Sequence, residues 1–488
     1  MAVRARLTAP QPAQQEWPWH EAKVGSLPVS LMFSGDRRME AESYLASGYG
    51  IRLSFEAQPA GWTRLEELAR VWQPNRLKGI QVGANHGTPF LGATQVFDLR
   101  PVPRKYLALE RTDDANNRFT TSGSILVTCS GSVGRTTLAH TAHENVLISH
   151  DLLRVDARTS EWWGWIYAFL HAPQARAMMS AAQYGHIIKH LETSHINALP
   201  IPLLKEEHRS QFNISVRRVL DTRSKAYELS VAAEAIYTEV FGELEIESLD
   251  EIGFSKSVLS LSKGRRRLDA TVNGPSHQKV IEHLSTQGKL QSLVEAGFDI
   301  WLPNRFKRVA AIEGIELIGS SNLFEVNPDL NKRIQDGDFG DDHKGRVQAG
   351  WMLLSRSGQV YGLNGSITIA TAAHENKIVS DHVIRIAPNE NLNVRTGYAF
   401  VALSHPELGR PRMKSLAYGS SIPEIEVADV QAMQIPRIDR RLENKIADHA
   451  EESSRLQAEA DILERQLAKD AEAIIDKFLV GHLDMIDH

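Results

Sequence analysis

The chain has 488 residues, of which 42% are hydrophobic and 24% are charged, and its formal net charge is −5. This is the composition of an ordinary soluble globular protein of about three domains, and the small negative charge argues against nucleic-acid binding over the whole surface. No segment suits a membrane span or a signal peptide, so a cytoplasmic location is expected, and the single cysteine, Cys129, excludes an intrachain disulfide and a cysteine-rich zinc site.

The order of patterns along the chain predicts alternating domains and helices. We expect an N-terminal extension and then a first domain of mixed α and β structure that ends in a long helical segment. A second domain of the same kind, a second helical segment and a short tail follow. The predicted boundaries are 1–33, 34–202, 203–245, 246–436, 437–480 and 481–488.

A block of the sequence recurs about 230 residues later with its short motifs in the same order. Pro74-Asn75-Arg76 matches Pro303-Asn304-Arg305, and His143-Glu144-Asn145 matches His374-Glu375-Asn376. Because a solenoid unit is only roughly 20 to 50 residues long, each copy is expected to fold as a domain of its own.

Each copy ends in a segment whose apolar residues step by four and three positions, which is typical of a coiled coil. The first stripe consists of Phe212, Val216, Val219, Arg223, Ala226, Ser230, Ala233, Tyr237 and Val240. The second consists of Leu442, Ile446, His449, Ser453, Leu456, Ala460, Leu463, Leu467, Asp470 and Ile474. Because both stripes must be buried, the helices are predicted to pack on each other as an antiparallel pair. The alternative is that each helix covers its own domain and the two never meet.

Known catalytic motifs are incomplete in this sequence. Ser132 resembles the serine of a nucleophile elbow, but Ser130 stands where that motif needs glycine, and Gln359 replaces Ser132 in the second copy. His143 and His374 lack the second histidine that a zinc protease needs four positions later. These histidines are expected to be hydrogen-bonded at the entry of a strand, or else to lie near a bound nucleic acid. We predict a protein without catalytic residues, metal or cofactor of its own, with a degenerate enzyme as an alternative.

The order of the motifs, the duplication and the trailing helices resemble the specificity subunit of Type I restriction-modification systems and of related methylation-linked defence systems. The residues that carry the resemblance are Gly123 to Gly134, their copy Gly350 to Gly358, and the run from Tyr418-Gly419-Ser420-Ser421-Ile422-Pro423 to Met433-Gln434-Ile435-Pro436. The resemblance covers almost the whole chain after the N-terminal extension. The extension itself and the His-Glu-Asn repeats depart from the family pattern.

The resemblance implies an α+β fold in which two pseudo-symmetric target-recognition domains are separated by two long antiparallel coiled-coil helices. It implies a non-catalytic subunit that recognises a bipartite, asymmetric DNA site and directs an adenine methyltransferase and a nuclease to it. The implied partners are double-stranded DNA, two methyltransferase subunits bound through the spacer helices, and restriction or translocase subunits. S-adenosylmethionine is expected on the methyltransferase subunit. No membrane contact is implied.

DNA contacts are predicted at polar and basic side chains beside the repeated Pro-Asn-Arg and the glycine-rich turns, because such groups bind phosphates and base edges. In the first copy these are Asn75, Arg76, Lys78, Ser132, Arg135 and Lys189. In the second copy they are Asn304, Arg305, Lys307, Arg308, Arg356, Gln359 and Ser420. Arg356 and Gln359 differ from their counterparts Cys129 and Ser132, as expected of residues that read different bases. The alternative function is a protein-interaction scaffold with two duplicated binding domains, which would show no salt-dependent DNA affinity.

Overall fold

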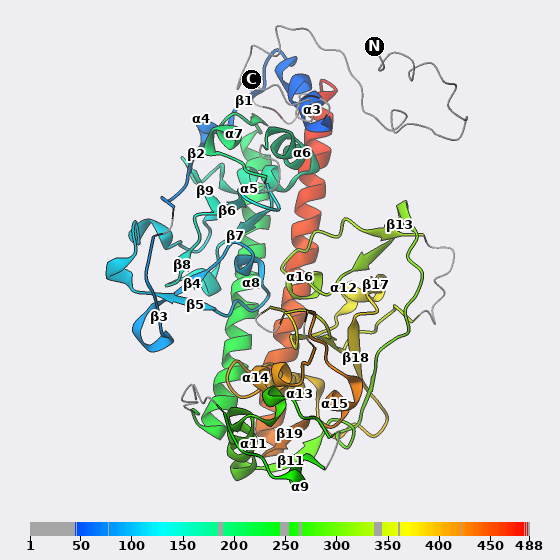
Figure 1. The fold of residues 1–488 in the computed structure, drawn as a ribbon. Coiled ribbons are helices and arrows are strands. Elements are labelled where there is room, and N and C mark those ends of the chain that lie inside the picture. The colour runs from blue at the N-terminus through cyan, green and yellow to red at the C-terminus, as the bar shows by residue number, and fades with distance from the viewer. Residues whose placement is uncertain are drawn as a thin grey trace, which may run out of the picture.

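The structure is a computed structural model that describes residues 44, 46–76, 78–183, 189–244, 253–262, 266–335, 344–359, 362–419, 421–482, 484 and 486. Two long helices, α8 (Glu206–Phe241) and α16 (Arg440–Leu479), run side by side through the molecule, and the domains pack against them (Figure 1). The predicted N-terminal extension lies outside the described residues. Within the described part of the chain, no helix is both long enough and apolar enough to cross a membrane.

The first domain contains two four-stranded sheets covered by short helices. Its elements are α3 (Ser47–Glu56), β1 (Trp62–Arg64), α4 (Leu65–Leu68), β2 (Ala69–Trp72), β3 (Gln81–Val82), η3 (Ala84–His86), β4 (Thr88–Leu91), η4 (Gln95–Phe97), β5 (Lys105–Leu107), η5 (Leu109–Arg111), η6 (Asn116–Arg118), β6 (Ile125–Thr128), β7 (Thr136–Leu138), η7 (Thr141–His143), β8 (Leu147–Ile148), β9 (Leu152–Ala157), α5 (Trp163–His171), α6 (Pro173–Ala182), α7 (Thr193–Asn197) and β10 (Pro200–Pro202). One sheet has the antiparallel order β2-β9-β6-β7. The other has the order β3-β5-β4-β8, in which β4 and β8 are parallel. Strands β1 and β10 pair at the two ends of the domain's sequence.

The second domain repeats this arrangement. Its elements are α9 (Val258–Leu261), α10 (Ala270–Asn273), α11 (Pro275–Gln287), β11 (Lys289–Ser292), β12 (Phe298–Trp301), β13 (Ala310–Ile318), η8 (Asn322–Phe324), β14 (Arg333–Ile334), β15 (Met352–Ser355), β16 (Ile367–Ile369), α12 (Ala372–Glu375), β17 (Ile378–Val379), β18 (Val383–Pro388), α13 (Thr396–Ser404), α14 (Arg410–Ser415), α15 (Val427–Gln431) and β19 (Gln434–Arg437). The sheets have the orders β12-β18-β15-β16, β14-β13-β17 and β11-β19. Equivalent strands therefore pair in equivalent ways, which confirms the predicted duplication and the α+β class.

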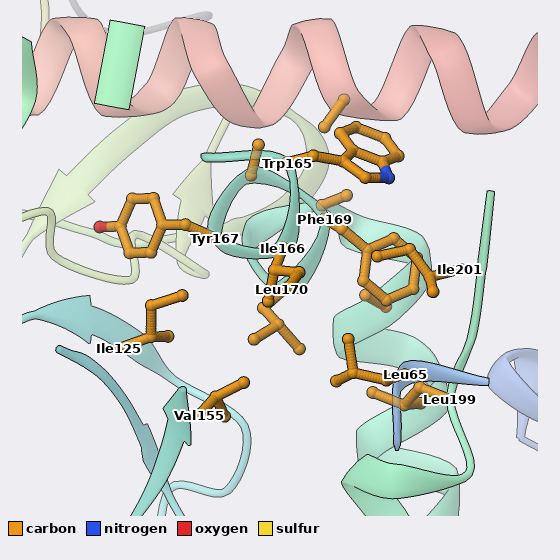
Figure 2. Close-up of a cluster of buried hydrophobic side chains, with 14 of the residues drawn as sticks. Leu65, Ile125, Val155, Trp165, Ile166, Tyr167, Phe169, Leu170, Leu199 and Ile201 are labelled. Atoms are coloured by element: carbon orange, nitrogen blue, oxygen red, sulfur yellow. The ribbon is translucent and has the colours of Figure 1, made fainter. Parts of the chain in front are cut away.

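The central strand β6 is buried on both faces, which is why it is a continuous apolar run. Ile125 and Val127 face the core that contains α5, whereas Leu126 belongs to a cluster on the other side of the sheet. Figure 2 shows α5 between the sheet, which contributes Ile125 and Val155, and the long helix above it. Trp165 on α5 is fully buried.

The long helices pair in an antiparallel manner, as predicted. Arg223 on α8 donates to Asp461 on α16 at 2.8 Å, and Ser453 on α16 donates to the Ala226 carbonyl oxygen at 2.6 Å. The alternative, in which the helices never meet, is therefore wrong. The beginning of α8 and the end of α16 join the core of the first domain, while the other two ends join the core of the second. Each domain is thus fixed to both helices.

The predicted stripe is accurate on α8 but drifts on α16. On α8 most of the predicted positions are buried, and Ser230 and Val240 are half-buried. On α16 the prediction is wrong at Asp470, which is exposed, and the buried positions beyond Ala460 are Glu464, Leu467, Ala471, Ile475 and Phe478. The face of a straight helix that meets its partner drifts away from a strict seven-residue repeat, so the buried positions shift along α16. This end of α16 also packs against α5 and α6.

The two domains contact each other through equivalent segments. The segment from Gly92 to Pro101 in the first domain matches the segment from Gly319 to Pro328 in the second. Leu99 donates its backbone N–H to the carbonyl oxygen of Phe324 at 2.8 Å, and Val326 donates to that of Phe97 at 2.7 Å. Leu99 is equivalent to Val326 and Phe97 to Phe324, so interchanging the two repeats turns each bond into the other. The domains are therefore related by a pseudo-twofold axis at this contact.

Candidate DNA interface

The segments that carry most of the predicted DNA contacts gather at one end of the main sheet in each domain. In the first domain, Trp72 at the end of β2 pairs with Arg154, and Thr128 at the end of β6 pairs with Leu152 at the start of β9. The loops after β2 and β6 and the loop before β9 therefore meet. Gln73 ties them together because its Nε2 donates to the His150 carbonyl oxygen at 2.7 Å. The second domain has the same arrangement at the ends of β12 and β15 and the start of β18.

In the first domain, a buried arginine holds the Pro-Asn-Arg loop. Arg118 is fully buried, and it donates to the carbonyl oxygens of Asn75 at 2.6 Å and Asp113 at 3.0 Å. The Asn75 backbone N–H donates to Asp114 at 2.9 Å, and this bond lowers the pKa of the Asp114 carboxyl group. The side chains of Asn75, Arg76 and Lys78 are exposed. A fixed backbone thus presents exposed polar and cationic groups.

In the second domain, the equivalent loop exposes Asn304, Arg305 and Lys307. Arg308 differs from them because it forms an ion pair with Asp381 and lies 5.5 Å from the Phe306 ring centroid. The partly exposed guanidinium of Arg308 is therefore bound to the loop before β18. Asn304, Arg305 and Lys307, on the Pro-Asn-Arg loop itself, are exposed to solvent.

The turn after β6 carries two of the predicted DNA contacts, Ser132 and Arg135, and their side chains lie in different surroundings. Ser132 is exposed, and the preceding Gly131 donates its backbone N–H to the carbonyl oxygen of the half-buried Lys189 at 3.2 Å. Arg135 instead extends into the second domain, where its guanidinium pairs with Glu325 at 2.7 Å. Its side chain is 14% exposed and lies 4.1 Å from the Phe97 ring centroid. Arg135 therefore links the two domains.

The turn after β15 exposes Gln359 but not Arg356. Arg356 pairs with Glu424 at 2.7 Å and donates to the Ile425 carbonyl oxygen at 3.2 Å, and its side chain is 18% exposed. Gln359 donates its Nε2 to the Ser421 carbonyl oxygen at 3.1 Å. The remaining predicted residue, Ser420, lies outside the described residues.

Sequence reasoning missed two buried arginines that organise this end of both sheets. Arg154 donates to the carbonyl oxygens of Ser149 at 3.0 Å and Ile148 at 3.2 Å, and also to that of Leu152. Arg385 donates to the equivalent carbonyl oxygens, those of Ser380 and Val379 at 2.8 Å each, and also to that of Val383. Burial lowers the pKa of each guanidinium to about 10. The available signal was an arginine in the third position of two strands that both begin with two apolar residues.

The histidines of the repeated His-Glu-Asn have structural roles, as one of the two interpretations predicted. His143 accepts the His140 backbone N–H at 3.0 Å, and its other ring nitrogen lies 3.1 Å from the Val96 carbonyl oxygen. His374 accepts the Thr371 backbone N–H at 3.1 Å. Burial lowers the pKa of both histidines to about 4. Each ring closes the short helical turn that precedes β8 or β17.

Comparison with known proteins gives matches among solved structures alone. No protein-family model and no curated protein matches the sequence. The chain is similar to the Type I restriction-modification system S subunit from M. genitalium, at 17% identity over 88% of this chain and 98% of that chain, with a TM-score of 0.34. It is also similar to the HsdS subunit from Thermoanaerobacter tengcongensis, at 13% identity over 87% and 98%, with a TM-score of 0.25. A third match, from work on complex assembly and conformational transition of the type I R-M system, has 14% identity over 87% and 99% and a TM-score of 0.26.

Proposed function

We propose that this chain is the non-catalytic DNA-specificity subunit of a Type I-like restriction-modification or methylation-associated defence complex. The observation that carries the proposal is the duplication itself: two domains of the same topology are related by a pseudo-twofold axis and fixed to an antiparallel helix pair. Two similar but non-identical domains suit a bipartite target whose halves differ in sequence.

The helix pair would set the distance between the two half-sites. Helix α8 has 36 residues and α16 has 40. At a rise of about 1.5 Å per residue these lengths correspond to about 54 and 60 Å. Both helices join both domain cores, so the spacing cannot change without disrupting a core. A fixed spacer of this length corresponds to about 16 to 18 base pairs at about 3.4 Å each.

The proposed DNA contacts are the exposed groups at the sheet ends. In the first domain these are Asn75, Arg76, Lys78 and Ser132, and in the second they are Asn304, Arg305, Lys307 and Gln359. Lysine and arginine would contact phosphates, and the amide side chains would reach base edges. Arg308 and Arg356 would serve mainly to shape the loops, since each guanidinium is paired with a carboxylate. Lys189, whose backbone lies beside the turn that holds Ser132, is a further proposed contact.

The proposed protein partners follow from the pseudo-symmetry. Two identical methyltransferase subunits, each carrying its own S-adenosylmethionine, would bind equivalent outward surfaces of the helix pair. Restriction or translocase subunits would join through them. The chain would contribute sequence recognition, and its partners the chemistry.

Methylome sequencing of the host with and without the gene tests the proposal. Loss of a single bipartite adenine-methylated motif on deletion, restored by the wild-type gene, is the expected result. An unchanged methylome, together with purified protein whose DNA affinity does not depend on salt, would contradict the proposal and favour a protein-interaction scaffold.

A further inference from the structure

The second domain has an open hollow of about 670 Å³ beside the end of β12. Two half-buried indoles line it: Trp301 and Trp351 meet edge to face, with their ring centroids 5.1 Å apart and an interplanar angle of 78°. The hollow falls within the range of about 300 to 1,000 Å³ that is usual for pockets holding small organic groups. Aromatic surface left accessible in such a place is suited to a flat ligand.

The other polar groups that line the hollow are amides, one carboxylate and two cations, Lys344 and Arg346. Asn304, Gln348 and Asn376 come from three separate segments, and Lys344 is exposed at its edge. Amide side chains both donate and accept hydrogen bonds, as the edges of nucleobases do. Glu375 has a supporting role here, because its carboxylate accepts the Ala349 backbone N–H at 3.0 Å.

The first domain lacks this indole pair. Trp72 is the counterpart of Trp301, but its Nε1 donates to Asp156 at 2.5 Å. Ser124 is the counterpart of Trp351. The indole pair therefore belongs to the second domain alone. A feature that distinguishes two half-sites must differ between the two domains, and this pair does.

We propose that this hollow holds one unstacked nucleobase of the half-site bound by the second domain. The base would stack on Trp351, its edge would face the amides of Gln348, Asn304 and Asn376, and Lys344 would lie near the adjoining phosphate. Stacking on an aromatic side chain is available to any base because every base has a π-face, whereas amide contacts select among bases. This inference rests on the proposed function, since it names what one recognition domain does with its half-site.

A mismatch scan of the half-site tests the inference. The full chain, bound to its methyltransferase partner, is titrated with duplexes that carry a mismatch at each position of the second half-site in turn. A base that must leave the stack leaves it more easily when it is unpaired, so one position should bind more tightly when mismatched. Trp351→Ser, which installs the residue of the first domain, should abolish that gain and weaken cognate binding about ten- to a hundredfold, the usual effect of losing one stacked base.

Two variants serve as controls. Trp351→Phe should keep most of the stacking and most of the affinity. Ser124→Ala at the equivalent position of the first domain should leave binding unchanged. Thermal unfolding of each variant shows whether the domain still folds, and the mismatch scan of the wild type tests the inference if Trp351→Ser does not fold.

The outcomes distinguish failure of the nucleobase site from failure of the proposed function. If the wild type binds its site specifically, but every mismatch weakens binding and Trp351→Ser behaves as the wild type, the nucleobase site is wrong and the proposed function stands. If the wild-type complex shows no sequence-specific binding, the proposed function fails and this inference fails with it.

Discussion

Asp98 and Glu325 occupy equivalent positions in the two domains and pair with each other as an isolated antiparallel bridge. The pseudo-twofold axis therefore passes between these two acidic residues. Arg135 pairs with Glu325 at 2.7 Å, whereas Asp98 faces Arg104 and Arg410 at longer range. Burial, with a smaller contribution from the Glu325 carboxylate, raises the pKa of Asp98 to about 7 despite these arginines.

This raised pKa predicts that the domain contact weakens as pH rises. Between about pH 4 and pH 7 the folded protein holds a proton on Asp98 that the unfolded chain has released, so the free energy of unfolding falls with pH. We expect Asp98 to lower stability by about 2 kcal/mol between pH 5 and pH 8, less than the full shift implies because the residue is partly accessible.

Urea unfolding of the wild type and of Asp98→Asn at both pH values measures this effect. The variant should lack the decrease, while buried histidines such as His143 and His374 contribute equally to both proteins and cancel. The same pH dependence in the two proteins would contradict the assignment to Asp98.

The helix pair contains a buried charged cluster, and we expect removal of its arginine to lower the stability of the protein strongly. Arg223 pairs with Asp461 and with Glu464, which also accepts the Tyr167 hydroxyl. Although burial raises the pKa of Glu464, the charge of Arg223 brings it below its ordinary value. Arg223→Ala leaves that carboxylate buried without its main partner and should cost about 3 to 5 kcal/mol.

An exposed pair on the same helices is the matched control. Arg218 pairs with Glu459 at 2.9 Å, but its side chain is 64% exposed. Arg218→Ala should therefore cost no more than about 1 kcal/mol. Chemical unfolding of both variants gives the comparison, and similar losses would show that burial of the Arg223 cluster is not what matters.

The repeated Pro-Asn-Arg predicts a pair of phosphate contacts. Arg76 and Arg305 are exposed in equivalent loops, and a group present in both domains is poorly suited to distinguishing two half-sites. Arg76→Ala and Arg305→Ala should each weaken binding to cognate and scrambled duplexes alike and reduce the salt slope by about one. Arg455→Ala, on the exposed face of α16, is the control. A loss confined to the cognate duplex would instead make these arginines base readers.

The features predictable from the sequence were those encoded locally. Short motifs repeated in the same order established the duplication, and three-four spacing of apolar residues located both long helices. Each motif and each stripe can be recognised without knowing which residues meet in the folded protein. The burial of Glu464 could not be predicted, since it depends on Arg223 and Tyr167, which approach it only after the domains and helices assemble. The role of Arg135 was hidden for the same reason: its partner Glu325 lies in the other domain.

The buried arginines of β9 and β18 give the last prediction, in which each domain is the control for the other. Arg154 and Arg385 each bind carbonyl oxygens of the loop that begins the strand, at the sheet end where the proposed DNA contacts gather. Arg154→Met should free the loop at 149–151 and leave its carbonyl oxygens without donors. We expect a loss of about 2 to 4 kcal/mol in the first domain, since several buried hydrogen bonds to a charged group disappear.

The consequence for recognition should be confined to one half-site. Arg154→Met should relax the first half of the methylated motif and leave the second half unchanged, and Arg385→Met should do the reverse. Methylome sequencing of strains carrying each variant provides the measurement, with chemical unfolding to confirm that the opposite domain is intact. Relaxation of both halves by either variant would mean that the two sheet ends do not act independently, because a purely local loop change cannot pass through the helix pair to the other domain.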